Sequence, residues 1–180
     1  MCIIKMRNFY YQEGIYEMNI KVFRIDDRLI HGQIVTKWIK EADNAKRILI
    51  IDDKAAKDKT LQMILKIAVP GGIELVIKTK KEGITYLAAD KTDINTLLLM
   101  RNPVEANEFM NMGFMISQIN LGNISNSKSI TGRKKILDYI YVENTDVEAL
   151  REITKKGIDI AVKAIPEEKT KDIRTLIKGL

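Results

Sequence analysis

Cysteine and histidine are almost absent from this chain: its 180 residues include one of each, Cys2 and His31. A single cysteine cannot form an internal disulfide and provides too few thiols for a structural zinc site, which favours a reducing compartment. Long hydrophobic runs are also missing, because the longest, such as Ile48–Ile51 and Thr96–Met100, are far shorter than the roughly 20 residues that a membrane-spanning helix needs. We therefore expect a soluble, cytoplasmic protein.

The chain also has few prolines and no glycine-rich phosphate loop. The three prolines, Pro70, Pro103 and Pro166, each fall at a predicted element boundary, and the chain contains no internal repeat, low-complexity tract or long linker. Neither common glycine-rich phosphate loop is present, which disfavours a nucleotide-binding enzyme. What the chain does have is a hydrophobic content of 46%, which suits one domain with a substantial core.

Residues 1–17 do not resemble the rest of the sequence, since their aromatic and polar side chains follow no helical or strand period. Met18 leads directly into an apolar-rich run, and the codons of Glu13-Gly14 would be purine-rich at about the spacing of a bacterial ribosome-binding site. We predict that residues 1–17 are an N-terminal extension, either disordered or an artefact of the assigned start, and that residues 18–180 form the domain.

From Met18 onward, short β-rich runs alternate with amphipathic stretches, which is the pattern of a parallel sheet crossed by helices. Most of the runs are continuously apolar, as expected for strands that are buried on both faces. This pattern predicts a single-domain α/β fold with an open, mostly parallel sheet of about seven strands and helices on both faces. The predicted strands are Ile20–Ile25, Arg47–Ile51, Ile73–Lys78, Thr96–Met100, Gln118–Leu121, Ile136–Val142 and Asp159–Val162.

Apolar residues recur at three- and four-residue spacing in two internal segments, which predicts packing helices. The second of these helices is predicted to begin with a capping box between Thr145 and Glu148 and to end at Gly157. The charged C-terminal segment is predicted to be a closing helix. The three predicted helices are Lys54–Val69, Thr145–Lys156 and Pro166–Leu180.

The single histidine lies in the segment Arg24–Gln33, where the first predicted strand ends. In open α/β sheets, ligands collect at the carboxyl ends of the strands, next to helix N-termini. An apolar face that includes Ile34 and Trp38 predicts a helix that begins near His31 and directs its positive dipole end at the same loop. We therefore place the candidate site in this loop.

The residue types of the loop favour phosphoryl chemistry. A neutral imidazole is a competent nucleophile, and Asp26 or Asp27 could accept the hydrogen of one ring nitrogen of His31, leaving the other free to attack phosphorus. The remaining aspartate would cap the helix. The alternative is an ordinary surface loop whose histidine happens to lie near charges.

A phosphoryl group on His31 would need N–H donors and positive charge around it. The backbone N–H groups of Gly32 and Gln33 could bind it at the start of the helix, where a glycine permits close approach. Arg24 or Arg28 would neutralise its charge. Arg24 fits a solvated surface position equally well, and the side chain of Gln33 could either donate to a phosphate oxygen or face solvent.

The segment Arg24–Ile34 resembles the phosphorylation-site loop of the enzyme IIB component of the mannose, fructose and sorbose family of bacterial sugar phosphotransferase systems. Three later segments, Ile50–Asp58, Ala68–Gly72 and Ile119–Asn123, are similar to that family in the same order. One departure is Asn120–Asn123, where the family's Asn-x-Gly loop would be followed by a second glycine.

This resemblance implies that His31 receives a phosphoryl group from a phosphohistidine of the IIA component and passes it to a sugar held by the membrane components IIC and IID. The attacking atom would be the δ nitrogen, Arg28 would stabilise the transferred group, and neither a metal nor another cofactor would be needed. The family's sheet is mostly parallel with seven strands. The resemblance also implies a cytoplasmic protein attached to the inner face of the membrane through IIC and IID, and a possible homodimer.

Two other functions fit parts of the sequence. Arg47–Asp53 resembles the strand and acidic pair of a regulatory receiver domain, but Leu97–Pro103 has no aspartate where a receiver needs its phosphoacceptor. The net charge of +6, from 30 basic and 24 acidic residues, and the run Arg133–Lys135 fit a nucleic-acid-binding protein. No recognition motif accompanies that run, and Trp38 is expected to pack in the core. The charge fits an acidic phosphoryl donor, or merely solvated surfaces, equally well.

Overall fold

The computed structural model describes residues 18–125 and 132–180, so the prediction for residues 1–17 lies outside the described residues. The described residues form an α/β fold around a seven-stranded sheet with the strand order β3-β2-β4-β1-β5-β8-β9. All neighbouring strands are parallel except β8 and β9. The strands of this sheet are β1 (Ile20–Asp26), β2 (Arg47–Ile51), β3 (Glu74–Lys78), β4 (Thr96–Met100), β5 (Gln118–Asn123), β8 (Asp159–Val162) and β9 (Lys171–Asp172).

The central strands are buried because they are apolar on both faces. Every residue of β2 and β4 is buried, as expected for parallel strands covered on each side. Alternate side chains of a strand point to opposite faces. Accordingly, Ile48 and Ile50 of β2 join one hydrophobic cluster, whereas Leu49 and Ile51 join the other.

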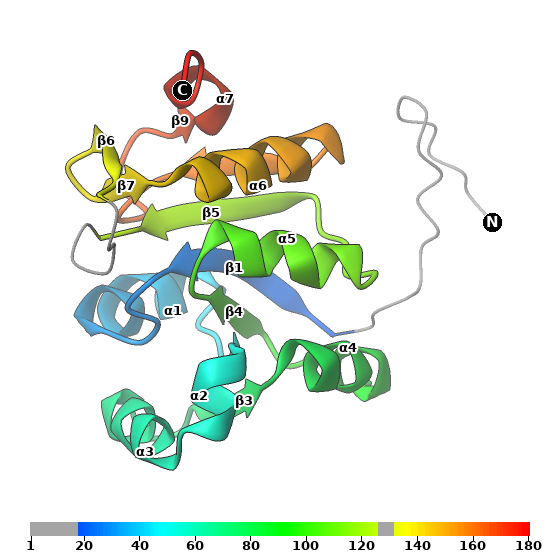
Figure 1. Ribbon diagram of the computed structural model, residues 1–180. Coiled ribbons are helices and arrows are strands. Elements are labelled where there is room, and N and C mark those ends of the chain that lie inside the picture. The colour runs from blue at the N-terminus through cyan, green and yellow to red at the C-terminus, as the bar shows by residue number, and fades with distance from the viewer. Residues whose placement is uncertain (1–17, 126–131) are drawn as a thin grey trace, which may run out of the picture.

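Helices cover both faces of the sheet, as predicted. One cluster contains residues of the helical turns η1 and α1 and of α2 and α3, and the other contains residues of α4, α5, α6 and α7. Figure 1 shows α5 and α6 in front of the sheet and α1 behind it. The helices are η1 (Ile34–Trp38), α1 (Ile39–Glu41), α2 (Asp53–Lys57), α3 (Lys59–Ala68), α4 (Lys80–Ala89), α5 (Pro103–Asn111), α6 (Asn144–Lys155) and α7 (Ile173–Leu176).

The prediction of one strand over Ile136–Val142 is wrong. This region forms a separate antiparallel hairpin of β6 (Lys134–Leu137) and β7 (Ile140–Val142). The run is divided by a turn at Asp138, a residue type that favours turns, and the carboxylate of Asp138 pairs with Lys135 at 2.7 Å. The seventh strand of the sheet is instead β9, which is short and exposed and therefore carries no hydrophobic signal.

The closing helix predicted over Pro166–Leu180 is also wrong. This segment forms a turn, then β9, and only then the four-residue helix α7. The backbone N–H of Arg174 donates to the side chain of Asp172 at 2.9 Å, which caps α7 at its first turn. Ile173 and Ile177 are buried, so two apolar side chains attach the segment to the core, and it lacks the apolar face of a longer helix.

The two other predicted helices exist with different boundaries. Lys54–Val69 is divided into α2 and α3 at Asp58, whose side chain accepts a hydrogen bond from the N–H of Leu61 at 3.0 Å and caps α3. The helix predicted to begin at Thr145 is α6, whose N-cap is Glu143; the Glu143 N–H donates to Asp146 at 3.0 Å. Gly157 has φ +81° just after α6, and the predicted helix end is confirmed.

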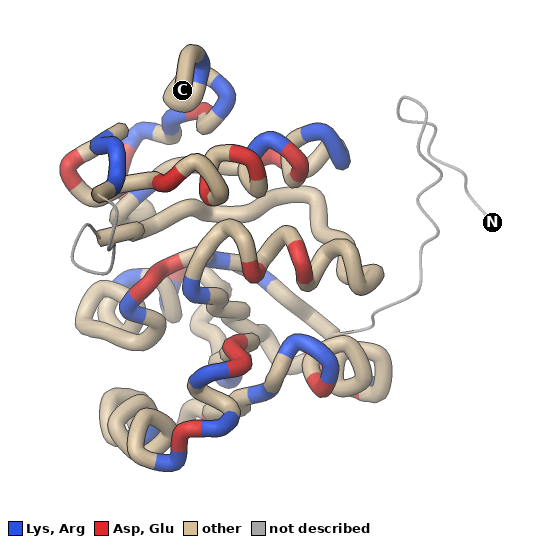
Figure 2. The backbone as a smooth tube through the Cα atoms, viewed as in Figure 1, with Lys and Arg blue, Asp and Glu red and all other residues tan. Residues whose placement is uncertain are grey.

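The charged residues are spread over most elements. Figure 2 shows the Lys and Arg positions along the backbone interspersed with those of Asp and Glu. No helix within the described ranges is long and apolar enough to cross a membrane.

Candidate functional site

The predicted site lies where β1 and β5 end side by side. Asp26, the last residue of β1, is paired in register with Asn123 of β5. The chain leaves β1 toward η1 on one face of the sheet, and it leaves β5 toward α6 on the other. Such a divergence opens a crevice at the carboxyl ends of the two strands, where ligands bind in α/β proteins.

A tight loop turns the chain from β1 back over the end of the sheet. The N–H of Leu29 donates to the backbone oxygen of Asp26 at 3.0 Å. Leu29 has φ +58°, a left-handed conformation that a leucine rarely adopts, and its side chain is 1% exposed. Burial of Leu29 therefore helps to hold a conformation that is locally unfavourable, as is common at functional sites.

His31 contacts one aspartate, and that aspartate is Asp26. The distance from His31 Nε2 to Asp26 Oδ2 is 2.9 Å, and the side chains are 15% and 0% exposed respectively. An ionised carboxylate only accepts hydrogen bonds, so in the neutral imidazole Nε2 carries the hydrogen and Nδ1 keeps its lone pair. Of the two aspartates left open by the sequence, the geometry selects Asp26.

Asp26 is ionised although it is fully buried. Burial alone would raise the pKa of this carboxyl, but the hydrogen bond to His31 and the positive charge of Arg24 outweigh it, and the pKa lies below its ordinary value. The other carboxylate oxygen, Oδ1, accepts the backbone N–H of Arg28 at 3.2 Å. Both oxygens are thus engaged, and the carboxylate is fixed against the imidazole.

Both sequence interpretations of Arg24 are wrong. Its side chain is fully buried, so it is not a solvated surface charge. It also cannot bind a phosphoryl group, because all five of its N–H donors already have acceptors. These acceptors are the Asp26 carboxylate at 2.8 and 3.3 Å, the Asn120 side chain, and the backbone oxygens of Lys163 and Ala164 at 3.0 and 3.2 Å.

Trp38, Asn120 and Gly122 enclose the Arg24 guanidinium. The guanidinium carbon lies 4.4 Å from the centre of the Trp38 ring, a cation–π contact, and Trp38 Nε1 donates to the oxygen of Ala164 at 3.1 Å. A Cβ at position 122 would overlap the guanidinium, so only glycine fits there. A signal for this role is present in the sequence, because Asn120 is a polar residue inside an apolar strand, but its partner lies in a distant segment.

Asp27 does not cap the helix as predicted. Its carboxylate accepts hydrogen bonds from Asn123 Nδ2 at 2.5 Å and from the N–H and Oγ of Ser125 at 3.0 and 2.5 Å. Its backbone oxygen accepts from Arg101 Nη1 at 3.1 Å, and Arg101 Nε donates to Asp52 at 2.6 Å. Asp27 therefore connects the loop to the ends of neighbouring strands.

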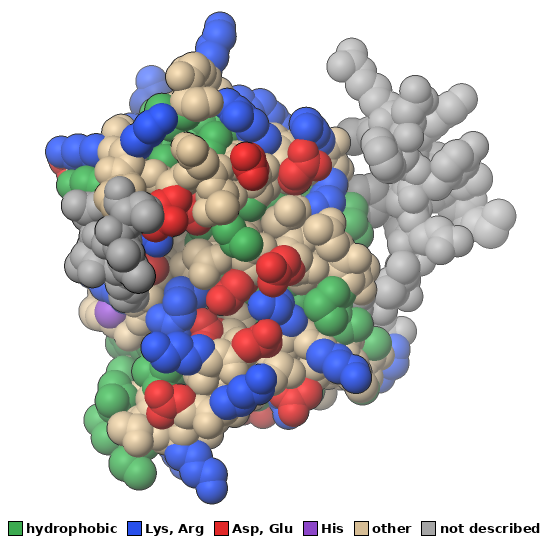
Figure 3. All heavy atoms as spheres, viewed as in Figure 1, with side chains coloured by type: hydrophobic (Ala, Val, Ile, Leu, Met, Phe, Trp, Pro, Cys, Tyr) green, Lys and Arg blue, Asp and Glu red, His purple; other side chains and the backbone are tan. Residues whose placement is uncertain are grey.

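Arg28, Gly32 and Gln33 lie around His31 on the solvent side. The side chain of Arg28 is 46% exposed, and its Nη2 donates to Gln33 Oε1 at 3.5 Å. The N–H of Val35 donates to the oxygen of His31 at 3.1 Å, which starts the predicted helix. No atom lies within 4 Å of the position of a Cβ on Gly32, so the space beside it is open. In Figure 3 the purple side chain of the single histidine reaches the surface at this edge.

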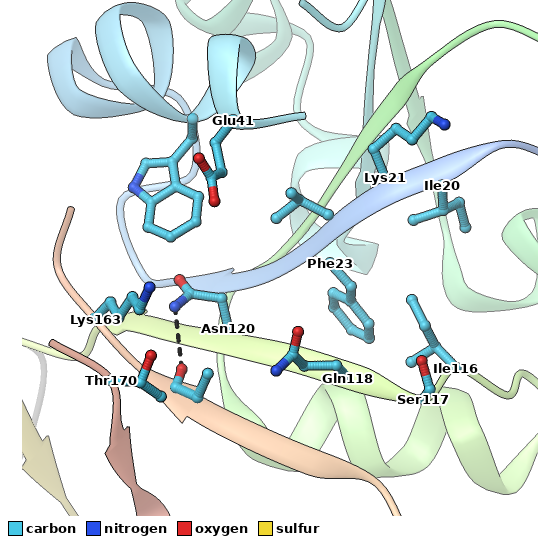
Figure 4. Close-up of a pocket in the computed structure, with 13 residues that line it drawn as sticks. Ile20, Lys21, Phe23, Glu41, Ile116, Ser117, Gln118, Asn120, Lys163 and Thr170 are labelled. Atoms are coloured by element: carbon cyan, nitrogen blue, oxygen red, sulfur yellow. Dashed lines mark hydrogen bonds between the residues drawn. The ribbon is translucent and has the colours of Figure 1, made fainter. Parts of the chain in front are cut away.

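A polar pocket of about 300 Å³ lies farther along the sheet, between α1, β1, β5 and β8. Trp38 lines it, and Figure 4 shows Glu41 and Asn120 around it, with the Asn120 side chain donating to the backbone oxygen of Ala161. Neither His31 nor Arg28 lines this pocket. It therefore shares Trp38 and Asn120 with the surroundings of Arg24 but does not contain the candidate nucleophile.

Both alternative functions would use residues that already make other contacts in the structure: Asp52 and Asp53 for a receiver domain, and Trp38 for stacking on a base. Asp52 caps α2 through the N–H of Ala55 at 2.6 Å and pairs with Arg101, and Asp53 pairs with Lys80 at 3.2 Å. The described residues contain no group of three or more His, Cys, Asp or Glu side chains that could hold a metal ion. Trp38 is 3% exposed, which confirms that it packs in the core, so it cannot stack on a base.

Comparison with known proteins identifies the family. The family model of the PTS system sorbose subfamily IIB component matches residues 20–179. The sorbose-specific EIIB component of Klebsiella pneumoniae is 30% identical over 157 residues, which are 87% of this chain and 93% of that protein. The crystal structure of the IIBSor domain of the sorbose permease from Klebsiella pneumoniae has a TM-score of 0.81 at 28% identity, covering 89% of this chain and 97% of the other.

A second relative is longer than this chain. The mannose-specific EIIAB component of Escherichia coli K12 is 30% identical over 164 residues, which are 91% of this chain and 50% of that protein. The chain thus spans about half the length of the mannose-specific relatives that it matches. The fold, the site geometry and these matches agree with the resemblance of the Arg24–Ile34 segment, and the chain belongs to the family of sorbose-subfamily IIB components of the sugar phosphotransferase system.

Proposed function

We propose that this chain is a phosphocarrier in which His31 accepts a phosphoryl group from the phosphohistidine of a IIA component. The group then passes to a sugar held by the membrane components IIC and IID. The observation that carries the proposal is the contact of His31 Nε2 with Asp26 at 2.9 Å. It leaves Nδ1 of His31 as the ring nitrogen with a free lone pair.

The first transfer forms one bond and breaks one. The lone pair of His31 Nδ1 attacks phosphorus, and the bond between phosphorus and the donor nitrogen breaks, with the electron pair returning to the donor imidazole. In the second transfer a sugar hydroxyl oxygen attacks phosphorus, the bond to Nδ1 breaks, and the hydroxyl proton is released. Little covalent chemistry is required of the protein, so catalysis consists mainly of positioning and charge stabilisation.

Asp26 fixes the reactive form of His31. Its buried carboxylate holds the hydrogen on Nε2 and fixes the ring orientation. Phosphorylation of Nδ1 withdraws electrons from the ring, and the carboxylate then stabilises the more positive Nε2–H group. Arg24 acts through Asp26, because its Nε and Nη2 groups donate hydrogen bonds to the Asp26 carboxylate and hold it in position. We therefore class Arg24 as a positioning residue.

Arg28 is the residue that stabilises the transferred group in this proposal. Its guanidinium is half-exposed, lies 3.7 Å from the Asp26 carboxylate that contacts His31, and donates to Gln33. Positive charge next to the equatorial oxygens of the transferred phosphoryl group is a main source of catalysis in phosphoryl transfer. The backbone N–H groups of Gly32 and Gln33, at the start of the helix, provide further donors for those oxygens.

The test is phosphorylation in a reconstituted system. The protein is incubated with phosphoenolpyruvate, the two general phosphotransferase proteins and a mannose-family IIA component, and its intact mass is measured. We expect one acid-labile phosphoryl adduct on the wild type and on Cys2→Ser, and none on His31→Ala. Cys2 is the matched control because it is the single cysteine of the chain and lies before the family match, which begins at residue 20. An adduct retained by His31→Ala would refute the assignment.

A further inference from the structure

Helix α3 has an apolar surface that faces solvent. Among the described residues, the large hydrophobic side chains with the highest exposure are Met63, Ile64 and Ile67 of this helix, at 66%, 59% and 80%. The helix buries only Leu65 fully. Clustered exposed apolar side chains on a folded domain indicate an interaction site, whereas scattered single ones do not.

The exposed surface of α3 lies on the same face of the sheet as the loop that carries His31. Gln62 Nε2 donates to the backbone oxygens of Ala55 and Ala56 at 2.9 and 2.8 Å, which holds α3 against α2, the helix that follows β2. Leu65 belongs to the same hydrophobic cluster as Leu29 and Ile30 of the His31 loop. Figure 3 shows hydrophobic side chains over α3 below the purple histidine, at the same side of the view.

The exposed charges of α2 and α3 are mainly positive. Four exposed lysines lie on these two helices, and none of them forms an ion pair with a described residue. The two acidic residues of the same stretch are engaged, since Asp53 pairs with Lys80 and Asp58 caps α3. A partner with acidic side chains around an apolar contact would complement this surface. The lysines are Lys54, Lys57, Lys59 and Lys66.

We propose that the α3 surface, defined as Met63, Ile64 and Ile67 with these four lysines, docks the protein that donates the phosphoryl group to His31. This proposal rests on the proposed function. His31 is only 15% exposed, so a folded donor must bring its phosphohistidine into direct contact and thereby cover the surface around the loop. A helix of ten residues with three exposed apolar side chains fits a small transient protein interface better than a membrane anchor, which needs a broader apolar face.

The test compares two pairs of substitutions. Ile64→Gln with Ile67→Gln removes the apolar contact, and Met112→Gln with Met115→Gln is the matched control. Met112 and Met115 are also exposed, at 43% and 45%, but they precede β5 and so lie at the opposite edge of the sheet. The measurement is the initial rate of His31 phosphorylation as the concentration of phosphorylated IIA is varied. We expect the KM to rise about tenfold for the α3 pair and less than twofold for the control.

A second phosphodonor separates docking from chemistry. Phosphoramidate, a small molecule that phosphorylates imidazoles directly, should modify the wild type and both double variants at equal rates. A further variant, Lys57→Glu with Lys66→Glu, should also raise the KM for phosphorylated IIA without changing its rate with phosphoramidate. It tests the charged rim independently of the apolar contact.

Three results would overturn the docking proposal. An unchanged KM in the α3 pair, with an active wild type, refutes docking and leaves the phosphocarrier function intact. A wild type that reacts with phosphoramidate but with no phosphorylated IIA refutes the proposed function itself. If the α3 pair leaves the KM unchanged but abolishes binding of the protein to phosphatidylglycerol–phosphatidylcholine vesicles, the surface binds the membrane and not the donor.

Discussion

At the scale of single residues, the proposed function makes the reactivity of His31 depend on charges that are buried beneath it. Asp26 and Arg24 are both fully buried and pair at 2.8 Å, and Asp26 contacts the imidazole. Buried ion pairs stabilise little in themselves, but removal of one partner leaves a buried charge without compensation. The pair is therefore best understood as a device that positions His31.

Substitution of Asp26 tests this role. Asp26→Asn leaves Arg24 buried without its counter-charge and removes the carboxylate that holds the hydrogen on Nε2. We expect the phosphorylation rate to fall by about 100-fold and the free energy of unfolding to fall by about 3 kcal/mol. Initial rates and chemical denaturation measure the two effects. A variant with normal rate and normal stability would contradict the assigned role.

The same carboxylate predicts a pH dependence of stability. The pKa of Asp26 is lower in the folded protein than its ordinary value of 3.8. Its contribution is therefore complete above that value and is lost as the pH falls through the folded-state pKa. The stability difference between wild type and Asp26→Asn should be largest near neutral pH and shrink below about pH 4. Denaturation curves across this range would contradict the account if the difference stayed constant.

Gly122 and Gly32 provide a matched pair of substitutions. A Cβ at position 122 overlaps the Arg24 guanidinium, whereas a Cβ at position 32 meets open space. Gly122→Ala should therefore lower the free energy of unfolding by about 2 kcal/mol, and Gly32→Ala should leave it within about 0.5 kcal/mol. Thermal or chemical unfolding checks both values. Equal stability of the two variants would show that Arg24 is free to move aside.

The sequence predicted the local setting of the candidate residues better than their contacts. The identity of His31 and its setting after a strand were readable because they depend on neighbouring residues. The burial of Arg24 was not, because its acceptors Asn120 and Ala164 are 96 and 140 positions away along the chain. The choice between Asp26 and Asp27 likewise depended on the turn at Leu29, whose φ of +58° no local pattern predicts.

At the scale of elements, apolar patterns succeeded where a strand is buried on both faces. The boundaries of β2 and β4 were predicted correctly because every residue in them is buried. β9 was missed because it has two exposed residues, and the β6–β7 hairpin was read as one strand across the turn at Asp138. Edge and hairpin strands are stabilised by pairing more than by burial, so composition describes them poorly.

The break between α2 and α3 leads to a prediction at this scale. Asp58 accepts the N–H of Leu61 at 3.0 Å as the N-cap of α3. Asp58→Ala should lower the free energy of unfolding by about 1 kcal/mol and leave the rate of phosphorylation by phosphoramidate unchanged, because the α3 cap does not contact His31. A loss below about 0.3 kcal/mol would mean that α2 and α3 can continue as one helix.

At the scale of the whole molecule, the strand order explains why the site lies where it does. β1 occupies the centre of the sheet between β4 and β5. The loop after β1 is therefore connected on both sides: Asp27 bonds to Asn123 and Ser125 beside β5, and its backbone oxygen bonds to Arg101 beyond β4. The proposed nucleophile, His31, is therefore carried by a loop that is bonded to both neighbouring parts of the sheet.

The central claim is that the phosphoryl group bonds to Nδ1 of His31, and one measurement tests it directly. Because the chain contains a single histidine, the ring nitrogens of the ¹⁵N-labelled, phosphorylated protein give one interpretable set of signals by nuclear magnetic resonance. The account predicts phosphorus–nitrogen coupling at Nδ1 and a hydrogen on Nε2. Coupling at Nε2 would contradict it, because that nitrogen is the one that Asp26 holds.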